Sequence, residues 1–412
     1  MTAPELRRRL GTADAVLIGL ASMIGAGVFA VFGPAAAAAG SGLLIALAAA
    51  AFVAYCNATS SARLAARYPV SGGAYVYGRE RLGEFWGYLA GWSFVVGKTA
   101  SCAAMALTVG LYAWPQHAHG VAVAAVVALT AVNYRGIEKS ALLTRAIVAV
   151  VLAVLAGVIA TVALSGRADA AGLELTGGGP AGVLQAAGLL FFAFAGYARI
   201  ATLGEEVRDP GRVIPRAIRL ALVTTLAVYT MVAVALMAAL GSELPGAAAP
   251  LADAVRVCGA GWLEPVVRAG AAVAALGSLL SLILGVSRTG LAMARGGHLP
   301  AALAAVHPRH RVPHRAELAL GTVVAVVAAT VDIRAAIGFS SLAVLIYYAI
   351  ANAAAWTLDR SPAGRLVAAL GLAGCLLLAV FLPSASALAG SVVVGIGALV
   401  YAATRLRRTG LR

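Results

Sequence analysis

The groups best suited to chemistry in this sequence are backbone atoms that glycines expose inside two apolar segments. Gly25 and Gly27 flank Ala26 in the first segment, and Gly196 lies within the sixth. Because glycine weakens a helix interior, we expect a helix break at both places. Past a break, the second half-helix presents free amides and the positive end of its dipole, which suit a carboxylate. The first half-helix ends in unpaired carbonyls, which suit an ammonium group.

These donors and acceptors together predict a ligand that carries both groups on one carbon, an α-amino acid. The amides of Gly25, Ala26 and Gly27 are expected to hold its carboxylate. The carbonyls expected to accept from its ammonium group are those near Met23, Ile24 and Ala195. Close helix packing is the alternative explanation for small residues in a membrane. A pair of interrupted spans in corresponding positions of two halves favours a transporter site instead.

Two basic side chains lie within apolar segments and belong to neither the inner nor the outer loops. Lys98 lies in FVVGKTASCAAM, and an ionisable group at membrane depth indicates a functional site. Lys98 either couples transport to protons or takes the place of a bound cation; a structural counter-ion or a snorkelling side chain is the alternative. Arg199 follows the second break, where a guanidinium repels cations and can pair with Glu205, which favours neutral or anionic amino acids. A gate, or contact with a neighbouring helix, is the other interpretation of Arg199.

The composition places these residues in an all-α polytopic membrane protein. Of 412 residues, 62% are hydrophobic and 11% charged, and the mean hydropathy is +0.93. No cleavage site follows a short apolar core near the N-terminus, so we expect no removed signal peptide. A span needs about 20 apolar residues, and this length predicts twelve transmembrane helices: Ala13–Phe32, Gly40–Ser60, Glu84–Tyr112, Gly120–Tyr134, Ala141–Ser165, Gly182–Leu203, Ala217–Leu240, Leu263–Ala292, Ala316–Val331, Ala335–Leu358, Gly364–Leu382 and Ser386–Thr404.

The basic residues predict the orientation of these spans. With the N-terminus in the cytoplasm, 25 of the 31 lysines and arginines fall in inner segments and four in outer ones, as the positive-inside rule requires. Both termini are therefore expected to be cytoplasmic. This distribution explains the net charge of +15 without a nucleic-acid partner. No linker separates a soluble domain, so residues 1–412 are predicted to form a single membrane domain.

Other residue patterns bear on the alternatives. The four cysteines form no CxxC pair, and the histidines between His298 and His314 lack zinc-site spacing, so no metal site, cofactor or enzyme activity is predicted. Ser278 and Ser281 leave open a sodium site. A channel requires a continuous polar pore, and a sensor would bind an amino acid without moving it; both remain alternatives to a transporter.

Four separated motifs resemble the amino acid permeases of the amino acid-polyamine-organocation transporter superfamily. They are IGLASMIGAGVF, YPVSGGAYVYGRERLGEFWGYLAGW, FFAFAGYARIATLGEEVRDPGRVIPRAI and LGVSRTGLAMARGGHLP. The resemblance implies a leucine-transporter-type fold of two inverted five-helix repeats, residues 13–165 and 182–358, with spans one and six unwound around the substrate. Residues 364–404 would then be two peripheral helices. It also implies a substrate side-chain pocket lined by Phe192, Phe194, Ala195, Gly196 and Tyr197, with core packing as the alternative for the aromatic residues.

The sequence departs from this family pattern in two places. Many proton-coupled relatives carry a lysine in span five, but here the matching position is near Val151, and the lysine is Lys98 in span three. Some relatives that carry cationic substrates place an acidic residue where Ala198 precedes Arg199. We therefore expect a secondary active transporter of the cell membrane that works by alternating access, as a proton-coupled symporter of neutral amino acids. An exchanger and a sodium-coupled symporter are the alternatives, and the oligomeric state is left open.

Overall fold

The computed structural model describes residues 10–68, 72–136, 141–166, 178–201, 207–358 and 361–409. These parts of the chain are helical, and their only β-type pairing is an isolated bridge between Leu10 and Val207. The α-helices are α1 Thr12–Met23, α2 Ala26–Ala30, α3 Phe32–Ala39, α4 Leu43–Arg67, α5 Ala74–Leu82, α6 Glu84–Ala113, α7 Ala118–Tyr134, α8 Ala141–Leu164, α9 Gly179–Phe194, α10 Ala198–Ala201, α11 Pro210–Leu240, α12 Pro250–Val257, α13 Glu264–Arg295, α14 His314–Thr330, α15 Ile333–Leu358, α16 Pro362–Phe381 and α17 Ser384–Thr409. Short 3₁₀ turns join several of them: η1 Gly40–Gly42, η2 Pro115–His117, η4 Ala195–Tyr197, η5 Gly241–Gly246, η6 Gly261–Leu263 and η7 Ala301–Ala304.

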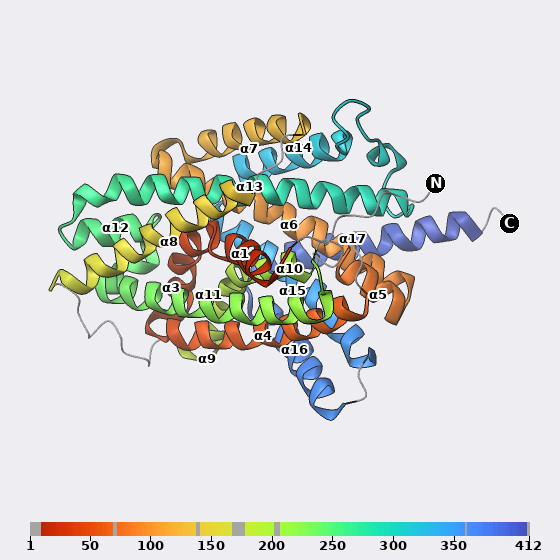
Figure 1. Cartoon of the computed structure of the whole chain (residues 1–412), viewed down its shortest axis with the longest axis horizontal. Helices are drawn as coiled ribbons and strands as arrows, with labels where there is room; N and C mark the ends of the chain where they lie inside the picture. The colour runs from red at the N-terminus through yellow and green to blue at the C-terminus, as the bar shows by residue number, and fades with distance from the viewer. Residues whose placement is uncertain are drawn as a thin grey trace.

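The long helices run side by side as a bundle along the longest axis of the molecule (Figure 1). Within the described residues, 11 helical stretches are long and apolar enough to cross a membrane. The polytopic all-α class is thereby confirmed. The ninth predicted span, Ala316–Val331, corresponds to α14, which has 17 residues and is shorter than those eleven.

Most predicted spans coincide with a helix, with differences at the ends. α6 and α8 begin where predicted, whereas α11 begins at Pro210 rather than Ala217, because proline is well suited to the first turn of a helix. α4 continues past Ser60 to Arg67 at the charged end of the bundle. Two short helices, α5 and α12, lie outside every predicted span.

The centre of the bundle is α6, which packs between α13 and α15. Small residues allow this approach: a Cβ on Gly97 would lie 2.8 Å from the Cβ of Ala343. Ser101 and Ser340 share a buried hydrogen bond of 2.6 Å between their hydroxyls across the same contact. The outward faces are apolar instead, with exposed Phe52, Leu142 and Leu376 on α4, α8 and α16. This is the distribution that a protein surrounded by lipid chains requires.

Candidate substrate site

The first helix break lies where Gly25 predicted it. α1 ends at Met23, and Ile24 and Gly25 leave the helical region, with ψ angles of 41° and −134°. The Ile24 amide still donates to the Leu20 carbonyl, at 2.7 Å, which closes the last turn of α1. α2 begins at Ala26, so the amides of residues 25–27 lie at its N-terminal end, where they have no partner within the helix.

The second break is a change of helix type around Gly196. α9 ends at Phe194 and continues as the 3₁₀ turn Ala195–Tyr197 before α10 resumes at Ala198. A 3₁₀ turn inside a longer helix often marks a hinge or a strained segment. Residues 202–206, which follow α10, lie outside the described residues.

The two breaks touch each other, and glycines make the contact possible. A Cβ on Gly196 would collide with the Ser22 carbonyl oxygen and would lie 2.8 Å from the Met23 nitrogen. A Cβ on Gly27 would lie 2.9 Å from the Cα of Ala193. The structure thus brings together the two segments that the sequence places about 170 residues apart.

α13 reaches the first break through Ser278. A Cβ on Gly25 would collide with the hydroxyl of this half-buried serine. Ser281, the second serine considered for a sodium site, is exposed, and its hydroxyl donates to the Gly277 carbonyl at 3.0 Å. Of the two serines, Ser278 is therefore the one that lies beside the glycine segment.

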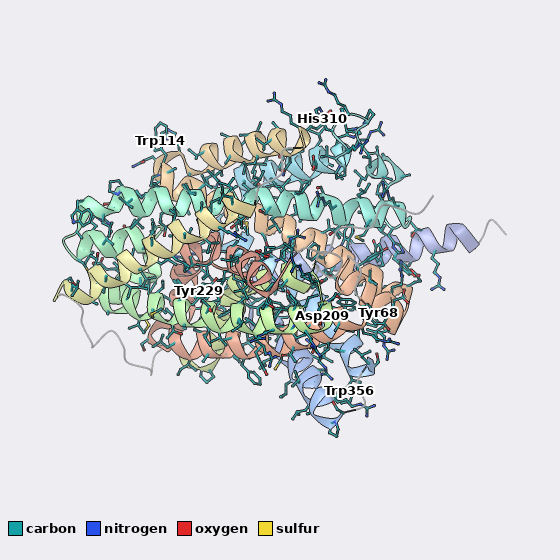
Figure 2. The ribbon with its side chains drawn as sticks, in the orientation of Figure 1. Tyr68, Trp114, Asp209, Tyr229, His310 and Trp356 are labelled. Atoms are coloured by element: carbon teal, nitrogen blue, oxygen red, sulfur yellow. The ribbon has the colours of Figure 1, made fainter. Side chains whose placement is uncertain are left out.

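Two tyrosines that the sequence analysis did not single out donate to the carbonyls at the breaks. The Tyr229 hydroxyl of α11 donates to the Met23 carbonyl at 2.5 Å and to the Ala193 carbonyl at 3.3 Å. The Tyr348 hydroxyl of α15 donates to the Ala195 carbonyl at 3.4 Å. Tyr229 lies at the middle of the bundle in Figure 2. The available sequence signal was a tyrosine within an otherwise apolar span, since a buried hydroxyl needs a partner.

The predicted pocket aromatics lie at the same place, and two of them pack against the tyrosines that hold the breaks. Phe194 packs edge-on against Tyr229, with ring centroids 5.1 Å apart, and Tyr197 lies 5.1 Å from Tyr348. Both are fully buried, whereas Phe192 keeps 8% of its surface exposed. All three aromatic residues therefore remain candidates for the pocket. Phe194 and Tyr197 also contribute to core packing.

The charged candidates lie on different helices and differ in exposure. Lys98 is 8% exposed in α6, one turn before Cys102. Val151, at the family's usual lysine position, is buried in α8. Arg199 is exposed on α10, while its expected partner Glu205 lies outside the described residues.

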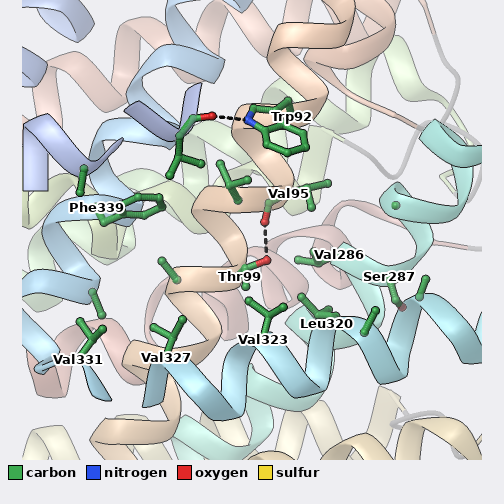
Figure 3. Close-up of a pocket in the computed structure, with 18 of the residues that line it drawn as sticks. Trp92, Val95, Thr99, Val286, Ser287, Leu320, Val323, Val327, Val331 and Phe339 are labelled. Carbon is green, nitrogen blue, oxygen red and sulfur yellow. Dashed lines mark hydrogen bonds between the residues drawn. The ribbon is translucent and has the colours of Figure 1, made fainter. Parts of the chain in front are cut away.

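A separate cavity of about 570 Å³ lies between α6, α13, α14, α15 and α17 (Figure 3). None of the predicted substrate-site residues lines it. Two of its polar groups bond within the protein: the Thr99 hydroxyl donates to the Val95 carbonyl at 2.7 Å and the Trp92 indole to the Val393 carbonyl at 2.9 Å. This lining suits apolar matter and offers no partner to the charged groups of an amino acid.

The described residues contain no cluster of three or more side chains that could hold a metal ion. The four cysteines are buried and free.

Residues 14–405 match the amino acid permease family, so the chain belongs to that family of membrane transporters. The chain is 69% identical to an uncharacterized transporter of Mycobacterium tuberculosis over 406 residues, which cover 98% of this chain and 92% of that protein. It is 28% identical over 354 residues to the branched-chain amino acid permease BcaP of Bacillus subtilis, covering 80% of this chain and 76% of the relative. It is 29% identical over 375 residues to the human cationic amino acid transporter 4, covering 84% of this chain and 58% of that relative. These are transporters rather than enzymes.

Proposed function

We propose that this permease is a secondary active transporter that moves neutral amino acids across the cell membrane by alternating access. The observation that carries the proposal is the contact between the two helix breaks, Gly196 against Ser22 and Gly27 against Ala193. Interrupted helices that meet inside a bundle put free backbone groups where a zwitterion can reach them. The amides of Gly25, Ala26 and Gly27 would hold the carboxylate.

The carbonyls of Met23, Ile24 and Ala195 are proposed to receive the ammonium group. Tyr229 donates to the Met23 carbonyl and Tyr348 to the Ala195 carbonyl. A carbonyl oxygen has two lone pairs, so each can still accept from a second donor. We therefore include both tyrosines in the proposed site as groups that hold the carbonyls in place. Phe192 and Phe194 would contact the substrate side chain.

We propose one membrane domain, 1–412, built from inverted repeats 13–165 and 182–358 with twelve spans and peripheral helices over 364–404. The two short helices support this arrangement, since α5 follows the second span of the first half and α12 the second span of the other half. α17, one of the two peripheral helices, is the least buried of the membrane-crossing stretches.

The neutral substrate class rests on the apolar and aromatic residues at the breaks and on Arg199. The name of the Bacillus subtilis relative specifies branched-chain amino acids, which fits such a lining. The human relative is named for cationic substrates; here Ala198 and Arg199 offer a cationic side chain no carboxylate. Coupling to protons is proposed to involve Lys98, and Ser278 beside Gly25 is the observation that favours sodium as the second candidate.

The experiment is a thermal-shift screen of the twenty amino acids on the purified protein, followed by uptake and counterflow in proteoliposomes. We expect stabilisation by neutral amino acids, saturable uptake that an inward proton gradient increases, and counterflow. Stabilisation by none would overturn the substrate class. Binding without counterflow would indicate a sensor, conduction without exchange a channel, and stimulation by a sodium gradient alone a sodium symporter.

A further inference from the structure

Glu317 is a buried carboxyl group for which the proposed substrate site has no use. It lies in the first turn of α14, and its exposed fraction is 0%. Neither of its carboxyl oxygens has a hydrogen-bond partner within the described part of the chain. Burial destabilises an ionised carboxylate in such a place, because it removes the hydration of the group and no hydrogen bond replaces it.

Two groups of the neighbouring helix α13, a hydroxyl and a guanidinium, face Glu317. On α13, the Ser287 hydroxyl and the Arg288 guanidinium act on the carboxyl group. The Ser287 hydroxyl donates its own proton to the Leu284 carbonyl, at 3.0 Å, so it can offer Glu317 only a lone pair. A carboxylic acid can donate to that lone pair, whereas a carboxylate cannot. On α7, Thr130 lies beside Gly321, one turn further along α14, and is uncharged.

α6 and the turn η7 also pack against α14, and the residues by which they line the cavity beside it are uncharged. α6 presents Val95 and Thr99, and the Thr99 hydroxyl is bonded to its own helix. The turn η7 presents Leu303. Arg288 is thus the charged group that acts on the carboxyl from another helix, and it is suited to stabilise a carboxylate once a proton has left.

A cluster of three histidines lies at the end of the bundle where α14 begins. His314 lies three residues before Glu317 on one face of α14, and its Nδ1 is buried without a hydrogen-bond partner in the described residues. The ring of His314 lies 5.4 Å from that of His307, which lies 4.7 Å from that of His310. Tyr134 of α7 packs against all three rings. Figure 2 shows His310 at the end of the α7 and α14 pair.

We propose that Glu317 is a proton-binding site of the transport cycle, protonated in this conformation, which exchanges its proton with solvent through the cluster of His314, His307 and His310. This inference rests on the proposed function, whose coupling ion it locates. On release, the proton leaves a carboxyl oxygen for an imidazole nitrogen and then for water. Only O–H and N–H bonds change, and the carboxylate left behind is stabilised by Arg288.

The first test measures protonation directly, without transport. Infrared difference spectra of the purified protein, recorded on a pH jump, should contain the carbonyl stretch of a protonated carboxylic acid. This band should be absent from Glu317→Gln and retained in Glu80→Gln, whose side chain is 45% exposed beside Arg79. In His314→Gln we expect the band to persist but its shift in deuterated water to slow at least tenfold. A band that persists in Glu317→Gln would overturn the proposal.

The second test measures coupling in proteoliposomes. Because glutamine mimics the neutral acid, Glu317→Gln should keep counterflow within about twofold of wild type and lose the increase in uptake produced by a proton gradient. Unchanged stimulation in Glu317→Gln would overturn the coupling role. A wild-type protein that transports without any response to the gradient would overturn the proposed coupling as a whole, while the infrared band would still decide protonation at Glu317.

Discussion

Gly196 is a residue at which the two broken helices touch. Its missing side chain allows the backbone of η4 to lie against Ser22 and Met23. Gly196→Ala should force the breaks apart, at a cost of about 1–3 kcal/mol as for other overpacked sites, and lower kcat/KM for uptake at least tenfold. The matched control is Gly285→Ala on α13, where an added Cβ meets nothing within 4 Å. Equal uptake by both variants would contradict the role given to the contact.

A substitution of Lys98 tests whether coupling requires an ionisable group at membrane depth in addition to Glu317. Lys98→Ala should retain substrate-induced thermal stabilisation and lose the response of uptake to an inward proton gradient, because the variant has no ammonium group to alternate between charged and neutral forms. Uptake into proteoliposomes with and without the gradient measures this. Cys102→Ala, one turn away in the same helix, is the control and should keep the response. An unchanged gradient dependence in Lys98→Ala would exclude the lysine from coupling.

At the scale of elements, the breaks are held by helices that are themselves unbroken. Tyr229 of α11 joins the end of α1 to α9 through two carbonyls. Tyr229→Phe should lower stability by about 2 kcal/mol, since it leaves buried acceptors without a donor, and should lower the Tm of the purified protein. Tyr55→Phe on α4, where the side chain is 49% exposed, should change stability by less than about 0.5 kcal/mol. A Tm unchanged by Tyr229→Phe would show that the hydroxyl does not hold the breaks together.

The helices and both breaks could be predicted because their signals are local. A run of apolar residues reports a membrane-crossing helix, and glycine at Gly25 or Gly196 reports its interruption. The tyrosines at the breaks could not be predicted in this way, since Tyr229 and Tyr348 come from helices that the sequence does not order in space; Ser278 was considered, but only as one of two possible sodium-site serines. Glu317 was overlooked for a related reason: burial of a carboxyl group in the first turn of α14 depends on α13 and α7 packing over it.

At the scale of the whole molecule, alternating access requires weak contacts at the end of the bundle that opens. One candidate joins α1 to α8, where Arg145 and Asp14 form an ion pair of 2.6 Å with side chains 55% and 31% exposed. The Leu10 carbonyl also accepts from the Arg208 amide, at 3.1 Å. An exposed ion pair contributes about 0–1 kcal/mol, so these contacts can break and re-form without a large barrier, unlike the buried contacts at the breaks.

The proposed orientation of the molecule rests on its charges, because 25 of the 31 lysines and arginines fall in segments that would be cytoplasmic. Trp114 and His310 mark opposite ends in Figure 2, and the four native cysteines are buried. A membrane-impermeant maleimide should therefore label Gln116→Cys, an exposed position in η2 beside Trp114, on intact cells. It should label Arg309→Cys, exposed beside His310, only after the membrane is permeabilised, since basic loops are retained in the cytoplasm. The unsubstituted protein is the control and should remain unlabelled in both conditions. Labelling of Arg309→Cys on intact cells would reverse the orientation and place the histidine cluster, and with it the exit for the proposed proton of Glu317, on the outer face.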